Sequence, residues 1–505
     1  MFRRTSRLLI AAILGTIAAQ GFAPANATVL SLASLSGLFY LIRHDRAAPI
    51  FWIVTAYAGA MWIVALRWLP RAFVMMDPPA VTAGWLALVA LSAILSLFWS
   101  VPFALARRYA NRNHGTQLLA TSSLLALGEW ARPTTIIGFA WNPLGAIWLD
   151  VPAIVRSASV IGITGLSFGT VLAAGLVLQI AGHPRRVGAS LGFIGALAIL
   201  LGRSSVAPPD TAQQVALIQG NIPQRVKWDE NRLDEQVDIY LGLTAGISST
   251  APDMRIFWPE AAIPYVLEDR KAVLDEIGKT LRTGAMLFAG ALGRDADGLY
   301  ANSVSRIDAS GMVRNRYDKR ILVPFGEYVP FESLLEALRL ARYAPGRDAL
   351  APGAAIPAIP LADGEAGVAI CFEATFPGFG SGFTARPAYI VNPTNDAWFG
   401  PAGAPQHLAQ ARIRALENGL PVLRATQTGI SAIIRSDGSI AGHLESGVRG
   451  VLVGRLPAAA QATVFSKIGA GYVLVFLVGS FGPILASRRR NAVRQGRWNF
   501  RRKRE

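Results

Sequence analysis

The chain has 505 residues, 52% of them hydrophobic and 16% charged, and its mean hydropathy is +0.37. This composition excludes a purely soluble protein of this length and indicates a polytopic membrane protein with an additional folded domain. The net charge of +17 is concentrated beside the apolar segments and in the C-terminal tail, which favours membrane topology over nucleic-acid binding.

Apolar stretches long enough to cross a bilayer follow one another from the N-terminus. They lie at about 8–24, 27–42, 49–66, 80–103, 116–131, 158–181 and 187–202, with an eighth near 468–486. We therefore expect a seven-helix transmembrane region in residues 1–203 and an eighth transmembrane helix in 468–486. Arg3, Arg4 and Arg7, followed by an apolar stretch and then Ala25-Asn-Ala27, also fit a cleavable signal peptide. An uncleaved helix is favoured because a second span follows at once.

Arginines set the expected orientation of these helices. With a cytoplasmic N-terminus, the inner loops and the tail are rich in arginine and the outer loops are poor in it, as the positive-inside rule requires. An odd number of spans then places residues 204–467 outside the cytoplasm. Residues 487–505 become a basic cytoplasmic tail that contacts anionic lipid.

Residues 204–467 have the mixed pattern of a layered α/β domain. Short apolar runs predict strands, and amphipathic runs predict helices at about 230–247, 270–283, 331–341 and 406–419. The predicted strands lie at about 215–219, 255–258, 285–291, 303–307, 313–317, 367–371, 389–392, 422–426 and 430–435.

Three polar residues stand at the ends of predicted strands, where α/β domains place their reactive groups. They are Glu260, Lys319 and Cys371, and Cys371 is the only cysteine of the chain. A thiolate attacks a carbonyl when a base takes its proton and a cation stabilises the oxyanion, so the three residue types form a possible catalytic set. Each also has a structural interpretation: a helix cap, a turn charge and a small buried hydrophobe, respectively.

Four motifs carry a family resemblance. Trp258-Pro-Glu260, Tyr317-Asp-Lys319 with Leu322-Val-Pro-Phe-Gly-Glu327, Cys371-Phe-Glu373 and Asn395-Asp-Ala-Trp-Phe-Gly400 resemble the nitrilase (carbon–nitrogen hydrolase) superfamily. Together with seven preceding spans and one trailing span, they look like the apolipoprotein N-acyltransferases of the Gram-negative inner membrane. The resemblance covers nearly the whole chain.

The resemblance implies a membrane α-helical bundle of about eight transmembrane helices that carries an inserted αββα sandwich. It implies a two-step acyl transfer from a phospholipid donor to the N-terminal amine of a diacylated apolipoprotein, the final step of lipoprotein maturation, through a Cys371 thioester. Glu260 is then the general base, and Lys319 is the donor to the oxyanion. The catalytic domain is expected in the periplasm.

Further residues receive roles only through the resemblance. Glu327 is expected to orient Lys319 or an incoming amine, and Glu373 to hold the nucleophile loop, with a structural salt bridge as the alternative for both. Trp228 and Trp398 are expected to line the substrate entrance, with core or interfacial packing as the alternative. Phe372 departs from the pattern, since many relatives have tyrosine after the nucleophile.

Two other functions stay open at this point. A membrane-tethered amidase that hydrolyses a small amide would need the same triad, and a transporter or sensor would need no nucleophile. No cofactor is implied, and no metal site is expected because the five histidines form no cluster with ligand spacing.

Overall fold

The structure is a computed structural model, and it divides into two compact units. One comprises Met1–Arg67, Trp85–Ser204 and Ile468–Glu505, and the other comprises Trp68–Gly84 and Ser205–Lys467. The residues described are 2–76, 79–110, 114–135, 138–180, 183–203, 205–248, 253–329, 350–353, 358–361, 364–377, 379, 385–472, 475–476, 478–479 and 482.

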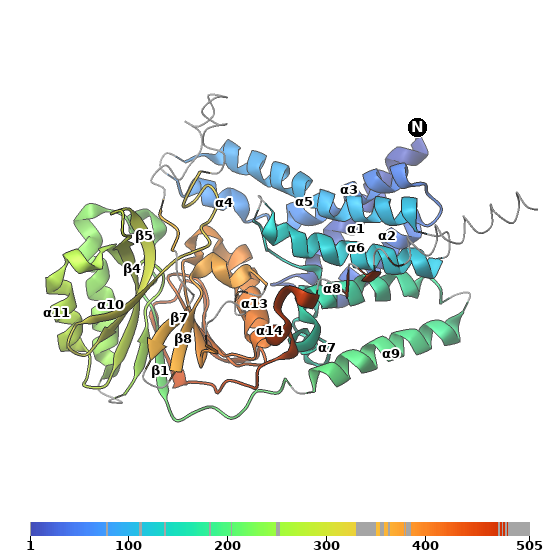
Figure 1. The fold of residues 1–505 in the computed structure, drawn as a ribbon. Helices are drawn as coiled ribbons and strands as arrows, with labels where there is room; N and C mark the ends of the chain where they lie inside the picture. Colours follow the sequence, from blue (N-terminus) through green and yellow to red (C-terminus); the bar gives the residue numbers. More distant parts are fainter. Residues whose placement is uncertain are drawn as a thin grey trace, which may run out of the picture. The chain divides into compact units, whose positions relative to one another are not determined.

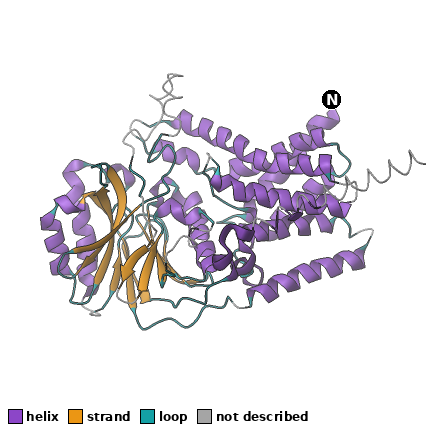
Figure 2. Ribbon diagram, viewed as in Figure 1, coloured by secondary structure: helices purple, strands orange, loops and turns teal. Residues whose placement is uncertain are grey.

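The first unit consists mainly of helices (Figures 1 and 2), and the sequences of these helices are largely apolar. Its main helices are α1 (Phe2–Ala18), α2 (Thr28–Ile42), α3 (Ala47–Ala65), α5 (Val81–Tyr109), α6 (His114–Thr134), α8 (Ala158–Val177) and α9 (Pro184–Gly202). Each of the seven apolar stretches is therefore helical, which satisfies the backbone polar groups internally, as lipid requires. Among the described residues, α3, α5, α8 and α9 are long and apolar enough to span a membrane, whereas the apolar parts of α1 and α2 are shorter.

Several predicted segments fall outside the described residues. They are the helix expected at 331–341, about half of the eighth span at 468–486 and the whole basic tail at 487–505. The division of the chain into seven spans, a domain, one span and a tail thus stays a prediction. One difference lies within the predicted transmembrane region 1–203: the segment Trp68–Gly84, with the short helix α4 (Leu69–Val74), belongs to the second unit.

The second unit contains two β-sheets (Figure 2). In the described residues, the first sheet has the strand order β13-β1-β2-β4-β5-β6, with β3 also paired to β4. The second has the order β12-β11-β10-β9-β8-β7. The strands of the first sheet are β1 (Gln214–Gln219), β2 (Arg255–Phe257), β3 (Ile263–Val266), β4 (Met286–Arg294), β5 (Tyr300–Asp308), β6 (Val313–Asp318) and β13 (Gly450–Arg455). Those of the second are β7 (Ala358–Leu361), β8 (Gly364–Val368), β9 (Tyr389–Thr394), β10 (Val422–Thr426), β11 (Ser431–Ile434) and β12 (Ile440–Leu444).

Alternation along the strands separates the layers of this unit. Val215 and Leu217 of β1 pack with residues of the second sheet, whereas Ala216 and Ile218 face the helices α10 (Leu233–Ser248) and α11 (Lys271–Thr280). On the other side, apolar residues of β9, β10 and β11 pack against α13 (Gly400–Asn418). Figure 1 shows α10 and α11 on one outer face and α13 on the other. The predicted αββα arrangement is confirmed.

The strand predicted over 367–371 ends earlier than expected. β8 stops at Val368, and Cys371 begins a short 3-10 helix that runs to Thr375. Four strands, β3, β7, β12 and β13, were not predicted, because glycine, proline or polar residues interrupt their apolar pattern.

Candidate active site

Glu260, Lys319 and Cys371 each follow the end of a strand, namely β2, β6 and β8. Two of these turns have an unusual backbone: φ is +49° at Cys371 and +45° at Ala261, the residue after Glu260. A residue other than glycine adopts this region only when its surroundings hold it there, and such residues are frequent at functional sites. The three turns bring the three side chains together.

The Glu260 carboxylate is the centre of the cluster. Its Oε1 accepts hydrogen bonds from Lys319 Nζ at 3.1 Å and from Asn302 Nδ2 at 2.7 Å, and its Oε2 accepts one from the main-chain N–H of Asn395 at 2.8 Å. Burial alone would raise the pKa of Glu260, but the nearby lysine ammonium groups and these donors outweigh it, so that the pKa lies below its usual value. Glu260 is therefore ionised at neutral pH.

Lys319 bridges two carboxylates. Its Nζ donates to Glu260 and, at 2.8 Å, to Glu327 Oε1, and its side chain is 1% exposed. Burial would lower its pKa, yet the two carboxylates raise it above the ordinary value. Lys319 is thus a fixed positive charge.

Cys371 is buried, and the Glu260 carboxylate acts on the pKa of its thiol. Burial, followed by the negative charge of Glu260, raises its pKa well above the usual range, and Lys319 only partly opposes this effect. The resting pair is consequently a carboxylate and a protonated thiol. Such a pair needs proton transfer to Glu260 as the sulfur attacks.

Glu327 and Glu373 occupy different parts of the site. Glu327 contacts Lys319 directly and also accepts hydrogen bonds from Asn302 Nδ2 at 3.0 Å and from Val323 N–H at 2.8 Å. Glu373 lies in the nucleophile turn, where it accepts four hydrogen bonds from neutral donors. Glu327 therefore takes part in a salt bridge with Lys319, whereas Glu373 joins two loops by hydrogen bonds to neutral groups.

The two tryptophans named from the sequence are placed differently. Trp228 is 50% exposed, and the ammonium of the adjacent Lys227 lies 5.9 Å from its ring centroid. Trp398 is partly buried at the end of the 3-10 helix Asp396–Trp398. Phe372 is buried, and its ring packs edge-on against Phe376 with centroids 5.2 Å apart.

Sequence reasoning missed several polar residues of the site. Asn302 contacts both Glu260 and Glu327, although it lies within β5 and has no motif of its own. Lys227 is 1% exposed and donates to the carbonyl oxygen of Glu260 at 3.0 Å. No local pattern marks either residue, because only strand pairing and burial bring them to the triad.

A buried cluster of charged and polar side chains contacts the main chain of the nucleophile turn. His407 of α13 lies with Nε2 3.1 Å from the carbonyl oxygen of Cys371 and with Nδ1 2.8 Å from Asp396 Oδ1. Arg424 donates to the other oxygen of Asp396 at 2.7 Å. The Phe399 ring packs edge-on with the rings of His407 and Trp68, with centroids 5.2 and 4.8 Å apart, respectively.

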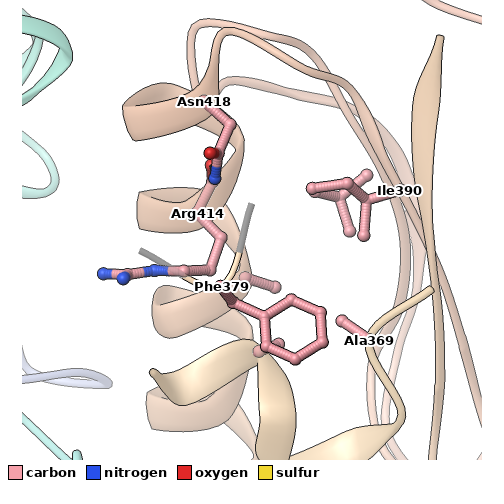
Figure 3. Close-up of a pocket in the computed structure, with 8 residues that line it drawn as sticks. Ala369, Phe379, Ile390, Arg414 and Asn418 are labelled. Carbon is pink, nitrogen blue, oxygen red and sulfur yellow. The ribbon is translucent and has the colours of Figure 1, made fainter. Parts of the chain in front are cut away.

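A small cavity lies next to this turn but outside the triad (Figure 3). Figure 3 shows Phe379, Ala369 and Ile390 beside α13, which contributes Arg414 and Asn418. Ala374, Ala411 and Val422 complete its lining. This lining contains no residue of the triad, so we do not assign the reaction to it.

The fold and this cluster define a class of protein: apolar helices joined to an αββα domain of the carbon–nitrogen hydrolase type. The carbon–nitrogen hydrolase family model matches residues 214–464, and the model of the apolipoprotein N-acyltransferase N-terminal domain matches residues 14–176.

Similarity to known proteins extends over nearly the whole chain. An apolipoprotein N-acyltransferase from Brucella suis biovar 1 (strain 1330) is 34% identical over 518 residues, which cover 96% of this chain and 97% of that protein. The one from Bradyrhizobium diazoefficiens is 33% identical, with 97% and 96% covered. The chain belongs to the apolipoprotein N-acyltransferase family. Among solved structures, an amidase from Nesterenkonia sp. is 19% identical, covers 50% of this chain and 93% of its own, and gives a TM-score of 0.37.

Proposed function

We propose that this protein transfers a fatty acyl chain from a phospholipid to the N-terminal amino group of a diacylated apolipoprotein. The observation that carries the proposal is the convergence of a buried carboxylate, ammonium and thiol from three strand ends, with Lys319 Nζ 3.1 Å from Glu260 Oε1. Its family membership supports the choice of lipid and lipoprotein as substrates.

In the first step, Glu260 takes the proton of the Cys371 thiol as the sulfur attacks an ester carbonyl of the phospholipid. Lys319 has three N–H donors, and two of them go to carboxylates. The third stabilises the oxyanion of the tetrahedral intermediate. When that intermediate collapses, the ester C–O bond breaks, the lysophospholipid oxygen receives the proton from Glu260, and a thioester remains on Cys371.

In the second step, the amine of the diacylglyceryl-cysteine attacks the thioester carbonyl. Glu260 accepts a proton from the amine, the C–S bond breaks, and the Cys371 sulfur takes a proton back. The product is an amide on the lipoprotein, which becomes triacylated. Trp228, half exposed beside Lys227, and Trp398 in the 395–400 motif are proposed to contact the lipid substrates.

Apolar helices make the chain a membrane protein, and we propose the inner membrane with the catalytic domain in the periplasm. The arginine distribution supports this orientation, because the short loops and the tail that would face the cytoplasm hold more arginine than the short loops that would face outside. Both proposed substrates are lipids, so a membrane location gives the enzyme access to them.

The test is the intact mass of the Cys371 peptide after the purified protein in detergent meets phospholipid without an acceptor. We expect a gain of one fatty acyl group, absent in Cys371→Ala and discharged by a diacylated lipopeptide. Glu260→Gln should keep the thiol but form the adduct far more slowly. If the folded protein forms no adduct and leaves the lipopeptide diacylated, acyl transfer is refuted, and hydrolysis of a small amide becomes the function to measure.

A further inference from the structure

A second lysine lies inside the active site. Lys227 follows a short 3-10 helix (Gln224–Val226), and its Nζ donates to the main-chain carbonyl oxygen of Glu260 at 3.0 Å. Gln236 of α10 fixes this segment by donating to the carbonyl oxygens of Val226 at 2.9 Å and Lys227 at 3.1 Å. The ammonium is therefore held in place rather than free to turn toward solvent.

A neutral hydrogen bond does not account for a buried ammonium. The carbonyl oxygen of Glu260 would accept equally well from a neutral donor, and a buried charge is costly unless negative charge lies nearby. Burial lowers the pKa of Lys227 to about 8, whereas the charges of Glu260 and Cys371 act in the opposite direction. The negative charge that favours the ammonium at rest is thus that of the general base, and the nucleophile adds its own charge once its thiol loses the proton.

Charge balance in the site requires a second cation. Lys319 is shared between Glu260 and Glu327, so one ammonium faces two carboxylates. Lys227 makes this group neutral while Cys371 is protonated. Without Lys227, the thiol would have to lose its proton next to an existing excess of negative charge.

The other charges around Cys371 do not replace Lys227. Asp396 acts on the thiol from the side of α13 and raises its pKa. Asp396 is itself paired with Arg424, so that cation is already engaged with a carboxylate. His407 also contacts Asp396, but burial lowers its pKa, so it adds no positive charge near neutral pH.

Lys227 also bears on the geometry of the base. The carbonyl that it holds belongs to Glu260, and the next residue, Ala261, has φ of +45°. Backbone of this kind persists only when its neighbours fix it. A contact at the Glu260 carbonyl is one such restraint.

We propose that Lys227 is a further positioning residue of the reaction, whose ammonium fixes the main chain of Glu260 and favours the thiolate form of Cys371. This inference rests on the proposed role of Cys371 as nucleophile. It gives the site two cations with different tasks: Lys319 faces the oxyanion, and Lys227 balances the charge of base and nucleophile.

The experiment is the rate at which iodoacetamide alkylates Cys371 in the purified full-length protein between about pH 6 and 10. Cys371 is the only cysteine, so every alkylated molecule reports on this thiol. Lys227→Gln keeps a donor for the carbonyl but removes the charge, and Lys227→Met removes both. At pH 7 we expect alkylation about tenfold slower in Lys227→Gln, equivalent to about one pKa unit. The deficit should shrink above about pH 8, where wild-type Lys227 loses its proton.

The control is Lys279→Met on α11, whose side chain is 70% exposed, and it should keep the wild-type profile. A Lys227→Gln profile that coincides with the wild type, or that differs by the same factor at every pH, would overturn the charge role. If Lys227→Met does not fold, Lys227→Gln still decides the question. Alkylation needs no lipid, so a wild type that is alkylated but never acylated by phospholipid contradicts the proposed function and not this comparison.

Discussion

Replacing Glu373 by glutamine would turn one carboxylate oxygen into an NH₂ group at a buried position surrounded by donors. Oε1 accepts hydrogen bonds from the Tyr317 hydroxyl at 2.9 Å, Arg320 N–H at 2.8 Å and Ile321 N–H at 3.1 Å, and Oε2 accepts one from Ile370 N–H at 2.7 Å. The amide oxygen of glutamine would take the side with three donors. Its NH₂ group would then face the Ile370 N–H.

One buried donor is thereby left without an acceptor, which costs about 1–3 kcal/mol. Ile370 directly precedes Cys371 and Arg320 directly follows Lys319, so the same change disturbs two residues of the triad. If about 2 kcal/mol of it is expressed in the transition state, acylation slows roughly 30-fold. The melting temperature should fall by about 4–8 °C for a domain of this size.

The assay is acyl-enzyme formation by intact mass at pH 8, together with thermal unfolding in detergent. This pH is chosen because burial raises the pKa of Glu373 to about 7, so the wild-type carboxyl is mostly ionised there and can accept all four bonds. Glu276→Gln on the exposed face of α11 is the matched control and should leave both values unchanged. A Glu373→Gln protein with wild-type melting and acylation at pH 8 would refute this reasoning.

Three other predictions concern the supports of the site. Trp68→Ala removes a buried ring whose centroid lies 4.8 Å from that of Phe399. We expect it to lower the free energy of unfolding by about 3 kcal/mol, measured by denaturant unfolding. Trp68→Phe keeps an aromatic ring and should lose less. Gly290→Ala would bring a Cβ into collision with the carbonyl oxygen of Pro259 and within 2.8 Å of Glu260 Cα, so the rate of acylation should drop sharply. The control is Gly242→Ala on α10, where no described heavy atom lies within 4 Å of the added Cβ. It should acylate normally and gain about 0.5–1 kcal/mol of stability. The pKa of Glu260 is lower in the folded protein than in the unfolded chain, so its contribution to stability is present above the unfolded pKa and lost as pH falls through the folded pKa. The melting temperature of Glu260→Gln should therefore fall less steeply from pH 7 downward than that of the wild type. Equal slopes would contradict the shift.

The sequence identified the triad by a physical rule that the structure obeys. A polar residue shortly after the end of a strand lies at the edge of the sheet, where strand ends from different parts of the chain meet. Glu260 and Lys319 follow β2 and β6 in this way, and the roles of the three residues stay predictions until they are tested. The apolar stretches could also be predicted from the sequence, because a long run without charged residues indicates a membrane-spanning helix whatever it packs against.

The residues that sequence reasoning missed depend on long-range pairing. Asn302 lies opposite Leu292 in the β4–β5 register, and the main-chain N–H of Lys319 donates to its carbonyl oxygen at 2.8 Å. That register, and no local pattern, turns its side chain toward Glu260. Lys227 stands in an irregular stretch beside an exposed tryptophan, where a lysine is ordinarily solvated. Its burial becomes apparent only once the domain has folded.

The electrostatics of the site favour a thiol that is reactive only toward a bound carbonyl. Glu260 is held ionised by Lys319, Lys227 and Asn302, and the pKa of Cys371 is raised by burial, so the thiolate is not the resting species. A base with a lowered pKa does not deprotonate a thiol with a raised pKa on its own. The transfer becomes favourable when the negative charge moves to an oxygen that Lys319 can contact, because the charge then lies next to a fixed cation. Reaction is thereby coupled to the presence of an ester or thioester carbonyl.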